Sequence, residues 1–126
     1  YPNSPSSFSN LAGAYIWTGN VDEARKLFKK AFALDPDHTS VSPNQFSYLV
    51  TQLENSKKLK EIFGLLDIAL ELYPKNAELH MEAANVYLKA GQKEKAIRYY
   101  KKVLELDPKL EEAKKKLEEL KKEKKK

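Results

Sequence analysis

The hydrophobic positions of this chain recur at the three- and four-residue spacing of amphipathic helices, not with the alternation of strands. The clearest runs are Ala83, Ala84 and Tyr87, followed by Tyr100 and Val103. Gly91 separates the two runs, where a helix-ending turn favours glycine. We therefore predict two helices joined by a short turn. The whole pattern predicts six helices, near residues 6–18, 21–34, 43–56, 58–72, 77–90 and 93–106.

Three prolines close nearly identical phrases and define a repeat. The phrases are Ala-Leu-Asp-Pro ending at Pro36, Glu-Leu-Tyr-Pro ending at Pro74 and Glu-Leu-Asp-Pro ending at Pro108. The last two prolines lie 34 residues apart and the first two 38 apart. A period of this length is typical of stacked helical repeats. We predict repeats at 5–38, 43–76 and 77–110, with residues 39–42 as an inserted linker.

The C-terminal segment predicts a seventh helix of a different kind. Leu110, Ala113, Leu117 and Leu120 form one narrow apolar stripe among lysines and glutamates. A helix with a polar back can cover the last exposed face of a repeat array. We therefore predict an all-α solenoid of three helical hairpins with a capping helix at 110–123. Residues 121–126 are expected to be a frayed basic tail, and 1–126 a single domain.

Charge and composition exclude several classes of function. The net charge is +5, but residues 109–126 hold nine lysines and five glutamates, so the basicity belongs mainly to the tail. That tail lacks the aromatic residues of a single-strand binder, and we predict no nucleic-acid partner. No apolar run is long enough for a membrane helix, and we expect no signal peptide, because the first residues lack a basic and an apolar region. With no cysteine in the chain, a cytoplasmic location is expected.

The sequence holds no constellation that indicates catalysis or metal binding. His38 and His80 are the only histidines, and neither has a second ligand at metal-binding spacing. Packing or solvation is the favoured interpretation of both. We expect no cofactor, no metal and no enzymatic activity. Gly64 falls inside a predicted helix, where close approach of a neighbouring helix or neutral drift would explain it.

The three repeats resemble tetratricopeptide repeats. The third carries Ala84, Tyr87, Gly91, Tyr100 and Pro108 at the family's positions, and the first matches nearly as well. The second is divergent, with Val50, Leu53 and Lys57 where a small residue, tyrosine and glycine are typical. The resemblance implies a right-handed superhelix whose first helices line a concave groove for a peptide or short helix. It places these residues in the groove: Ser9, Gly13, Ile16, Ser47, Tyr48, Thr51, Glu78, Met81, Glu82, Asn85 and Leu88.

The groove positions indicate the kind of ligand. The subgroup that grips chaperone C-terminal carboxylates uses cations, whereas Glu78 and Glu82 would repel a carboxylate here. Chaperone-tail binding is therefore disfavoured. We expect a neutral or basic peptide held by Tyr48, Met81 and Leu88, with Asn85 bonding its backbone. Trp17 is either a further exposed anchor or a packing residue.

Alternatives to a peptide-binding scaffold remain at this point. Residues 77–126 are close to an idealised repeat and residues 1–76 are not, which suggests an engineered or partly designed chain with no native ligand. The chain also begins without methionine, so it is alternatively an accessory domain excised from a larger enzyme. We expect a monomer, with weak self-association possible through the C-terminal leucine stripe.

Overall fold

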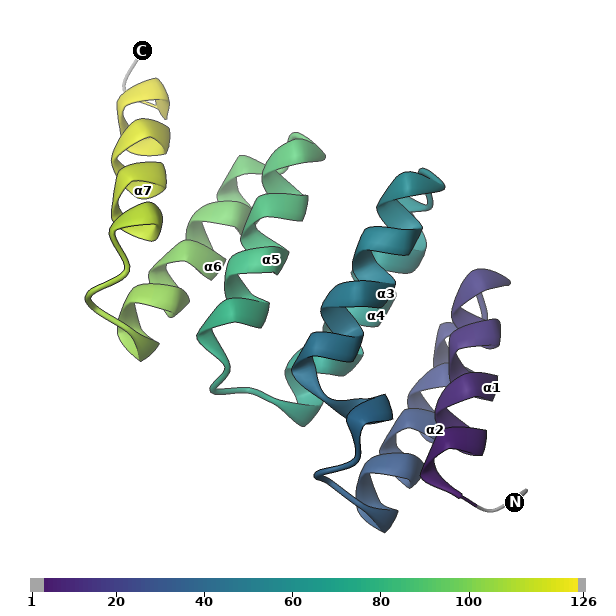
Figure 1. Cartoon of the computed structure of the whole chain (residues 1–126). Helices are drawn as coiled ribbons and strands as arrows, with labels where there is room; N and C mark the ends of the chain where they lie inside the picture. The colour runs from purple at the N-terminus through teal and green to yellow at the C-terminus, as the bar shows by residue number, and fades with distance from the viewer. Residues whose placement is uncertain (1–3, 125–126) are drawn as a thin grey trace. The chain divides into compact units, whose positions relative to one another are not determined.

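The computed structural model describes residues 4–124, and this range contains seven α-helices and one short 3-10 helix, with no strand (Figure 1). The all-α prediction is therefore confirmed for the described residues. The bounds are α1 Pro5–Trp17, α2 Val21–Leu34, η1 Thr39–Val41, α3 Pro43–Asn55, α4 Leu59–Leu72, α5 Ala77–Lys89, α6 Lys93–Leu106 and α7 Glu111–Lys124.

The helices gather into two compact units, residues 1–74 and 75–126. In unit 1 the hairpins α1–α2 and α3–α4 pack through α2 and α4, with η1 between the hairpins along the chain. In unit 2 the hairpin α5–α6 is followed by α7, which packs on α6. The prediction of one domain spanning 1–126 stays a prediction.

Local signals start the first helix of each hairpin. Ser4 and Ser42 accept hydrogen bonds at Oγ from the backbone N–H of Ser7 and Gln45, each at 3.2 Å. Both caps precede a proline at the first helical position, whose missing N–H costs nothing there. Asn76 begins α5 in the same way, with its Oδ1 2.9 Å from the Leu79 nitrogen. The first helix of each of the three hairpins therefore begins with the same kind of side-chain cap.

The turns inside the hairpins differ in their chemistry. Gly19 and Gly91 adopt φ of 85° and 81°, a region that glycine occupies without strain. Lys57 takes the corresponding turn of the second hairpin and has φ of 59°. The second hairpin therefore keeps the turn but loses the residue best suited to it.

Unit 1 is held by close apolar contact between its hairpins. The rings of Phe28 on α2 and Phe46 on α3 have centroids 5.0 Å apart, and both side chains are fully buried. A Cβ at Gly64 on α4 would lie 2.6 Å from Cγ2 of Val21 on α2. Close approach of a neighbouring helix, one of the two explanations for this mid-helix glycine, is therefore what the structure shows.

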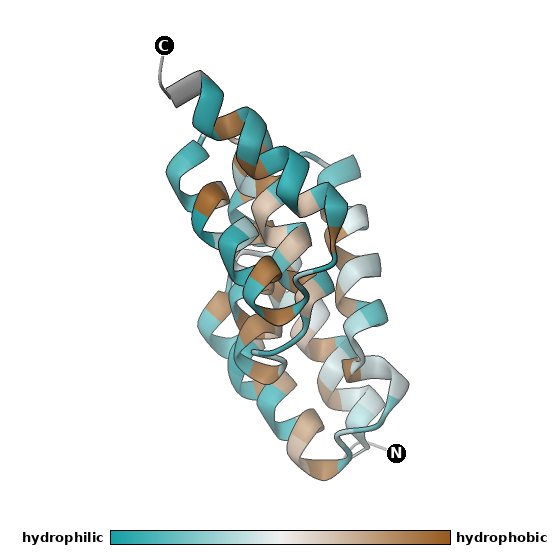
Figure 2. Cartoon of the chain, turned by 90° about the vertical axis from the view of Figure 1, so that its left-hand side faces the viewer, coloured by the Kyte–Doolittle hydropathy of each residue, from teal (hydrophilic) through white to brown (hydrophobic). Residues whose placement is uncertain are grey.

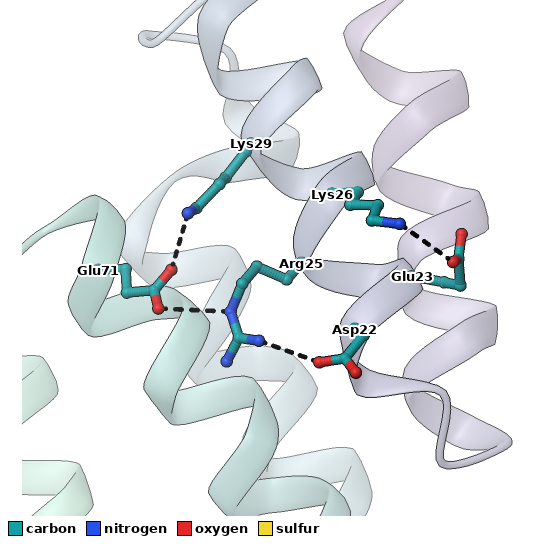
Figure 3. Close-up of polar contacts among 6 residues, drawn as sticks. All are labelled: Asp22, Glu23, Arg25, Lys26, Lys29 and Glu71. Atoms are coloured by element: carbon teal, nitrogen blue, oxygen red, sulfur yellow. Dashed lines mark hydrogen bonds and ion pairs between the residues drawn. The ribbon is translucent and has the colours of Figure 1, made fainter.

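A charge network joins α2 to α4 on the surface of unit 1 (Figure 3). Glu71 on α4 lies 3.3 Å from Nε of Arg25 and 3.2 Å from Nζ of Lys29. Arg25 also reaches Asp22 at 3.3 Å within α2. Since these side chains are partly exposed, each pair contributes about 0–1 kcal/mol, and the network fixes orientation more than stability.

Unit 2 has an aromatic interior and a polar-backed last helix. The Tyr87 ring on α5 stacks on the Tyr99 ring of α6, with the ring centroids 5.4 Å apart. The His80 ring packs on the same Tyr99 ring, with a centroid distance of 6.0 Å. Ala113, Leu117 and Leu120 of α7 are buried, and Figure 2 shows α7 as otherwise mostly hydrophilic. α7 is helical through Lys124, and fraying of 121–124 stays a prediction; residues 125 and 126 of the predicted tail lie outside the described range.

Candidate binding surface on unit 1

The inserted linker forms an ordered 3-10 helix that packs on its neighbours. Its residues 39–41 form η1, which packs against α1, α2 and α3. His38 caps this element: the backbone N–H of Ser40 donates to His38 Nδ1 at 3.1 Å. An accepting Nδ1 carries no proton, so the ring proton is on Nε2, 3.4 Å from Ser6 Oγ. Because Ser6 lies on α1, the histidine ties the linker to the first helix.

The linker is also held from the other side. Val41 is fully buried, and its carbonyl accepts a hydrogen bond of 2.8 Å from the Tyr73 hydroxyl. Burial and the nearby Asp37 carboxylate raise the pKa of Tyr73, so its hydroxyl keeps the proton that it donates. The Tyr73 ring packs edge-on against the Phe32 ring, with the ring centroids 5.6 Å apart. Tyr73 occupies the position at which the other repeats have aspartate. Tyrosine at this position supplies the hydrogen bond to the Val41 carbonyl of the insertion.

A cavity of about 260 Å³ lies between α1 and α3, beside the linker. Its floor includes Phe28 from α2, and Ser40 of η1 contributes to one wall. Ser40 Oγ and Ser9 Oγ form a hydrogen bond of 3.0 Å, which restricts both side chains. None of the lining side chains is charged: Ser9, Asn10, Gly13, Ala14, Trp17, Phe28, Ser40, Gln45 and Leu49. The arrangement can receive an uncharged group and offer it a few hydrogen bonds.

Gly13 leaves part of this cavity empty. A Cβ built on Gly13 would meet no atom within 4 Å, unlike one built on Gly64. Gly13 lies inside α1 and its φ is not in the left-handed region, so neither packing nor backbone conformation requires glycine. Glycine in a helix costs about 1 kcal/mol relative to alanine. The folded unit alone gives no reason for this cost.

Trp17 stands at the edge of the cavity, with 38% of its surface exposed. Lys58 lies over its ring at 5.5 Å and donates to its carbonyl at 3.3 Å. Of the two interpretations, the structure supports a partly exposed aromatic side chain held by a cation. The neighbouring Ile16 is the packing residue, with 2% exposed.

The predicted groove residues of unit 1 fall into three groups. Ile16 is buried, with 2% of its surface exposed, and offers no contact surface, whereas Ser9 is 6% exposed and lines the cavity with its hydroxyl paired to Ser40. Gly13 lines the cavity. On α3, Tyr48 is 57% exposed, Thr51 is exposed with its hydroxyl bonded to the Ser47 carbonyl, and Ser47 is half-buried.

The predicted residues of unit 2 all lie on α5. Glu78 is exposed, Glu82 and Leu88 are half-buried, and Met81 is 9% exposed. Asn85 is half-buried, and its Oδ1 accepts a hydrogen bond from the hydroxyl of the fully buried Tyr100. Burial, with the carboxylates of Glu112 and Glu119, raises the pKa of Tyr100 to about 12. One lone pair of Oδ1 accepts from Tyr100, which leaves Asn85 its second lone pair and the two N–H groups of Nδ2 for a ligand.

Sequence reasoning missed several cavity residues. Asn10 occupies the repeat position equivalent to Tyr48, so the repeat register itself could have identified it. Gln45 and Leu49 face α1 from α3. Ser40 had no signal, because nothing in the repeat predicts where an insertion places its side chains.

The described residues show no group of three or more histidine, cysteine, aspartate or glutamate side chains able to hold a metal ion. His80 is 7% exposed and packs on Tyr99, which supports a packing role. Among residues 4–124, none of the helices has the length and hydropathy to cross a bilayer.

Two of the three repeats match a known protein family. The tetratricopeptide repeat family model matches residues 5–38 and 77–110, while the divergent second hairpin is not part of the match. Protein CTR9 homolog from Arabidopsis thaliana is 32% identical over 105 residues. That match covers 80% of this chain but only 9% of the much longer relative.

Solved structures share the fold. A crystal structure of MamA aligns with 98% of this chain and 70% of its own, with TM-score 0.63 and 22% identity. PilF from Pseudomonas aeruginosa aligns with 98% of this chain and 55% of its own, with TM-score 0.60 and 21% identity. These likenesses agree with the family match, which covers more than half of the residues. The chain belongs to the tetratricopeptide repeat family.

Proposed function

We propose that this chain is a non-enzymatic interaction module that binds an extended peptide segment of a protein partner on the first helices of its hairpins. Membership of a repeat family whose arrays serve as protein scaffolds supports interaction in general. The observation that carries the peptide proposal is the uncharged cavity between α1 and α3. A peptide can lay one side chain into it while its backbone runs along the helices.

Each unit offers further contacts on its own first helices. Tyr48 offers a large exposed ring, and tyrosine is enriched at binding hot spots. On α5, Asn85 offers an amide donor for a peptide carbonyl, beside the apolar Met81 and Leu88. Glu78 and Glu82 make the face of α5 acidic, which favours a neutral or basic peptide and disfavours a chaperone C-terminal carboxylate.

A random linear peptide library displayed on phage tests this proposal. Selected peptides should be neutral or basic, and binding of the best should fall at least about tenfold, or 1.4 kcal/mol, in the variant Tyr48→Ala. Circular dichroism should show unchanged helicity in that variant. Lys101→Ala on the exposed side of α6 is the matched control and should bind normally.

The alternatives predict a different outcome. A designed repeat without a native ligand, or an accessory domain whose parent enzyme supplies the activity, would select no peptide above the background of an unrelated helical protein. Selection of acidic peptides with a free C-terminus would contradict the predicted ligand class while leaving a binding role intact.

A further inference from the structure

The four-residue insertion and a helix glycine meet at the same cavity. Ser40 comes from the insertion and Gly13 from α1, and both line the space between α1 and α3. Packing does not require a glycine at position 13, because a Cβ built there meets no atom within 4 Å. The insertion packs through the buried Val41, and this packing places Ser40 on the cavity lining. Both features shape the cavity.

We propose that this cavity is the specificity pocket of the module and accepts one uncharged aromatic side chain of the bound peptide. This inference rests on the proposed peptide-binding function and names the residue class that the function selects. Gly13 would let the ring approach the α1 backbone, Trp17 would contact the ring, and Leu49 would close the opposite wall.

Size and charge select this occupant. A volume of about 260 Å³ lies below the roughly 300–1,000 Å³ of pockets that enclose drug-sized ligands, so the cavity suits one large side chain. Burying a charged group there would be costly, because none of the lining side chains carries the opposite charge. The partly exposed Trp17 ring gives an aromatic side chain a stacking or edge-on partner that an aliphatic one cannot use.

The bonded serines define the polar side of the pocket. Ser40 Oγ lies 3.0 Å from Ser9 Oγ and 2.8 Å from His38 Nδ1, so its hydroxyl is held by partners within the protein. Asn10 and Gln45 are the longer polar side chains on the lining. Their amides can reach the peptide backbone where it enters the pocket, which leaves the interior to the ring.

The decisive variant is Gly13→Ala, because its effects on folding and on binding have opposite signs. The new methyl group meets no protein atom and improves the helix, so Tm should rise, by about 2–6 °C for a chain of this size. The same methyl group occupies the pocket, so affinity for the selected peptide should fall at least about tenfold. Gly13→Leu, which fills more of the space, should reduce binding further.

The control variant is Lys57→Gly, which relieves a left-handed turn outside the cavity and keeps the same backbone conformation. It should raise Tm and leave affinity unchanged, which shows that stabilisation alone does not weaken binding. Trp17 is the only tryptophan, so its fluorescence reports on the pocket directly. Peptides whose aromatic residue is replaced by glutamate should neither bind tightly nor shift that fluorescence.

The outcomes separate the two proposals. Selected peptides that bind the Gly13→Ala variant normally and leave Trp17 fluorescence unchanged would overturn the pocket and leave the proposed function standing. Selected peptides enriched in aliphatic or charged residues at the sensitive position would overturn the aromatic specificity. Failure to select any peptide would overturn both.

Discussion

Lys57 is a lysine in a backbone conformation that favours glycine. Its φ of 59° matches the role of Gly19 and Gly91 in the other hairpins. A side chain in the left-handed region costs about 1–2 kcal/mol, so Lys57→Gly should raise the free energy of unfolding by about 1 kcal/mol after the added freedom of the unfolded glycine is counted. Urea denaturation with an unchanged m-value would check this; a loss of stability would show that the lysine side chain has a compensating contact.

Gly64 should resist the substitution that helps Gly13. In Gly64→Ala the new methyl group would overlap Val21, whose Cγ2 lies 2.6 Å from the Cβ position. Such overpacking costs about 1–3 kcal/mol, which exceeds the helix gain of about 1 kcal/mol. Thermal unfolding should show a lower Tm.

The double variant Val21→Ala, Gly64→Ala tests the mechanism of that loss. Removing the methyl groups of Val21 opens the space that the alanine needs, so the double variant should be more stable than the sum of the single changes predicts, by roughly 0.5–3 kcal/mol. Strict additivity would mean that the α2–α4 contact does not cause the effect.

Tyr100 should make stability fall at alkaline pH. Its pKa is raised from 10.0 to about 12, so the folded state favours the neutral phenol. Its contribution is complete below pH 10 and is lost as pH rises through about 12, with a size on the order of 2 kcal/mol. Urea denaturation at pH values on both sides of this interval should show the loss in the wild type and a smaller one in Tyr100→Phe. Equal losses would place the titration elsewhere.

The contacts of some individual residues could be predicted from the sequence, and those of others could not. Gly64 stood out because helix interiors avoid glycine, but the sequence left close approach and neutral drift as alternatives. The hydrogen bond from Tyr100 to Asn85 could not be predicted, because both residues fit their repeat positions whether or not they are in contact. The burial of Ser9 and Ile16 depends on how α1 rotates against its neighbours, which periodicity fixes only to within part of a turn.

Among the elements, α7 is the one whose removal is most informative. Its buried face consists of Ala113, Leu117 and Leu120, and it packs on α6. Burying a leucine fully is worth about 1.5–3 kcal/mol, so a chain ending at residue 109 should expose the α6 surface and lose several kcal/mol of stability. Light scattering should detect aggregation or self-association. A truncated chain that stays monomeric and equally stable would contradict the capping role.

The helices themselves were largely predictable, because caps, closing prolines and apolar spacing agree along the chain. The linker was not. Residues 39–42 contain no apolar period, and their structure depends on partners far away in sequence, Ser9 and Tyr73. The position of the cavity therefore emerges only once the fold brings these elements together.

In the whole molecule, regular repeat features build the fold, and departures from the repeat form the proposed binding surface. The regular features recur in 5–38 and 77–110, which the family model matches. The cavity combines the insertion, Gly13 and side chains from α1, α2 and α3. Specificity is thus expected from the irregular first junction of unit 1.

The most direct test of this claim is NMR chemical-shift mapping of the isotope-labelled protein during titration with a library-selected peptide. The largest backbone shifts should fall at Gly13, Ser40 and Leu49, with a matching shift of the Trp17 indole N–H. Saturable shifts confined to the outer surfaces of α2, α4 or α6, with these residues unmoved, would contradict it.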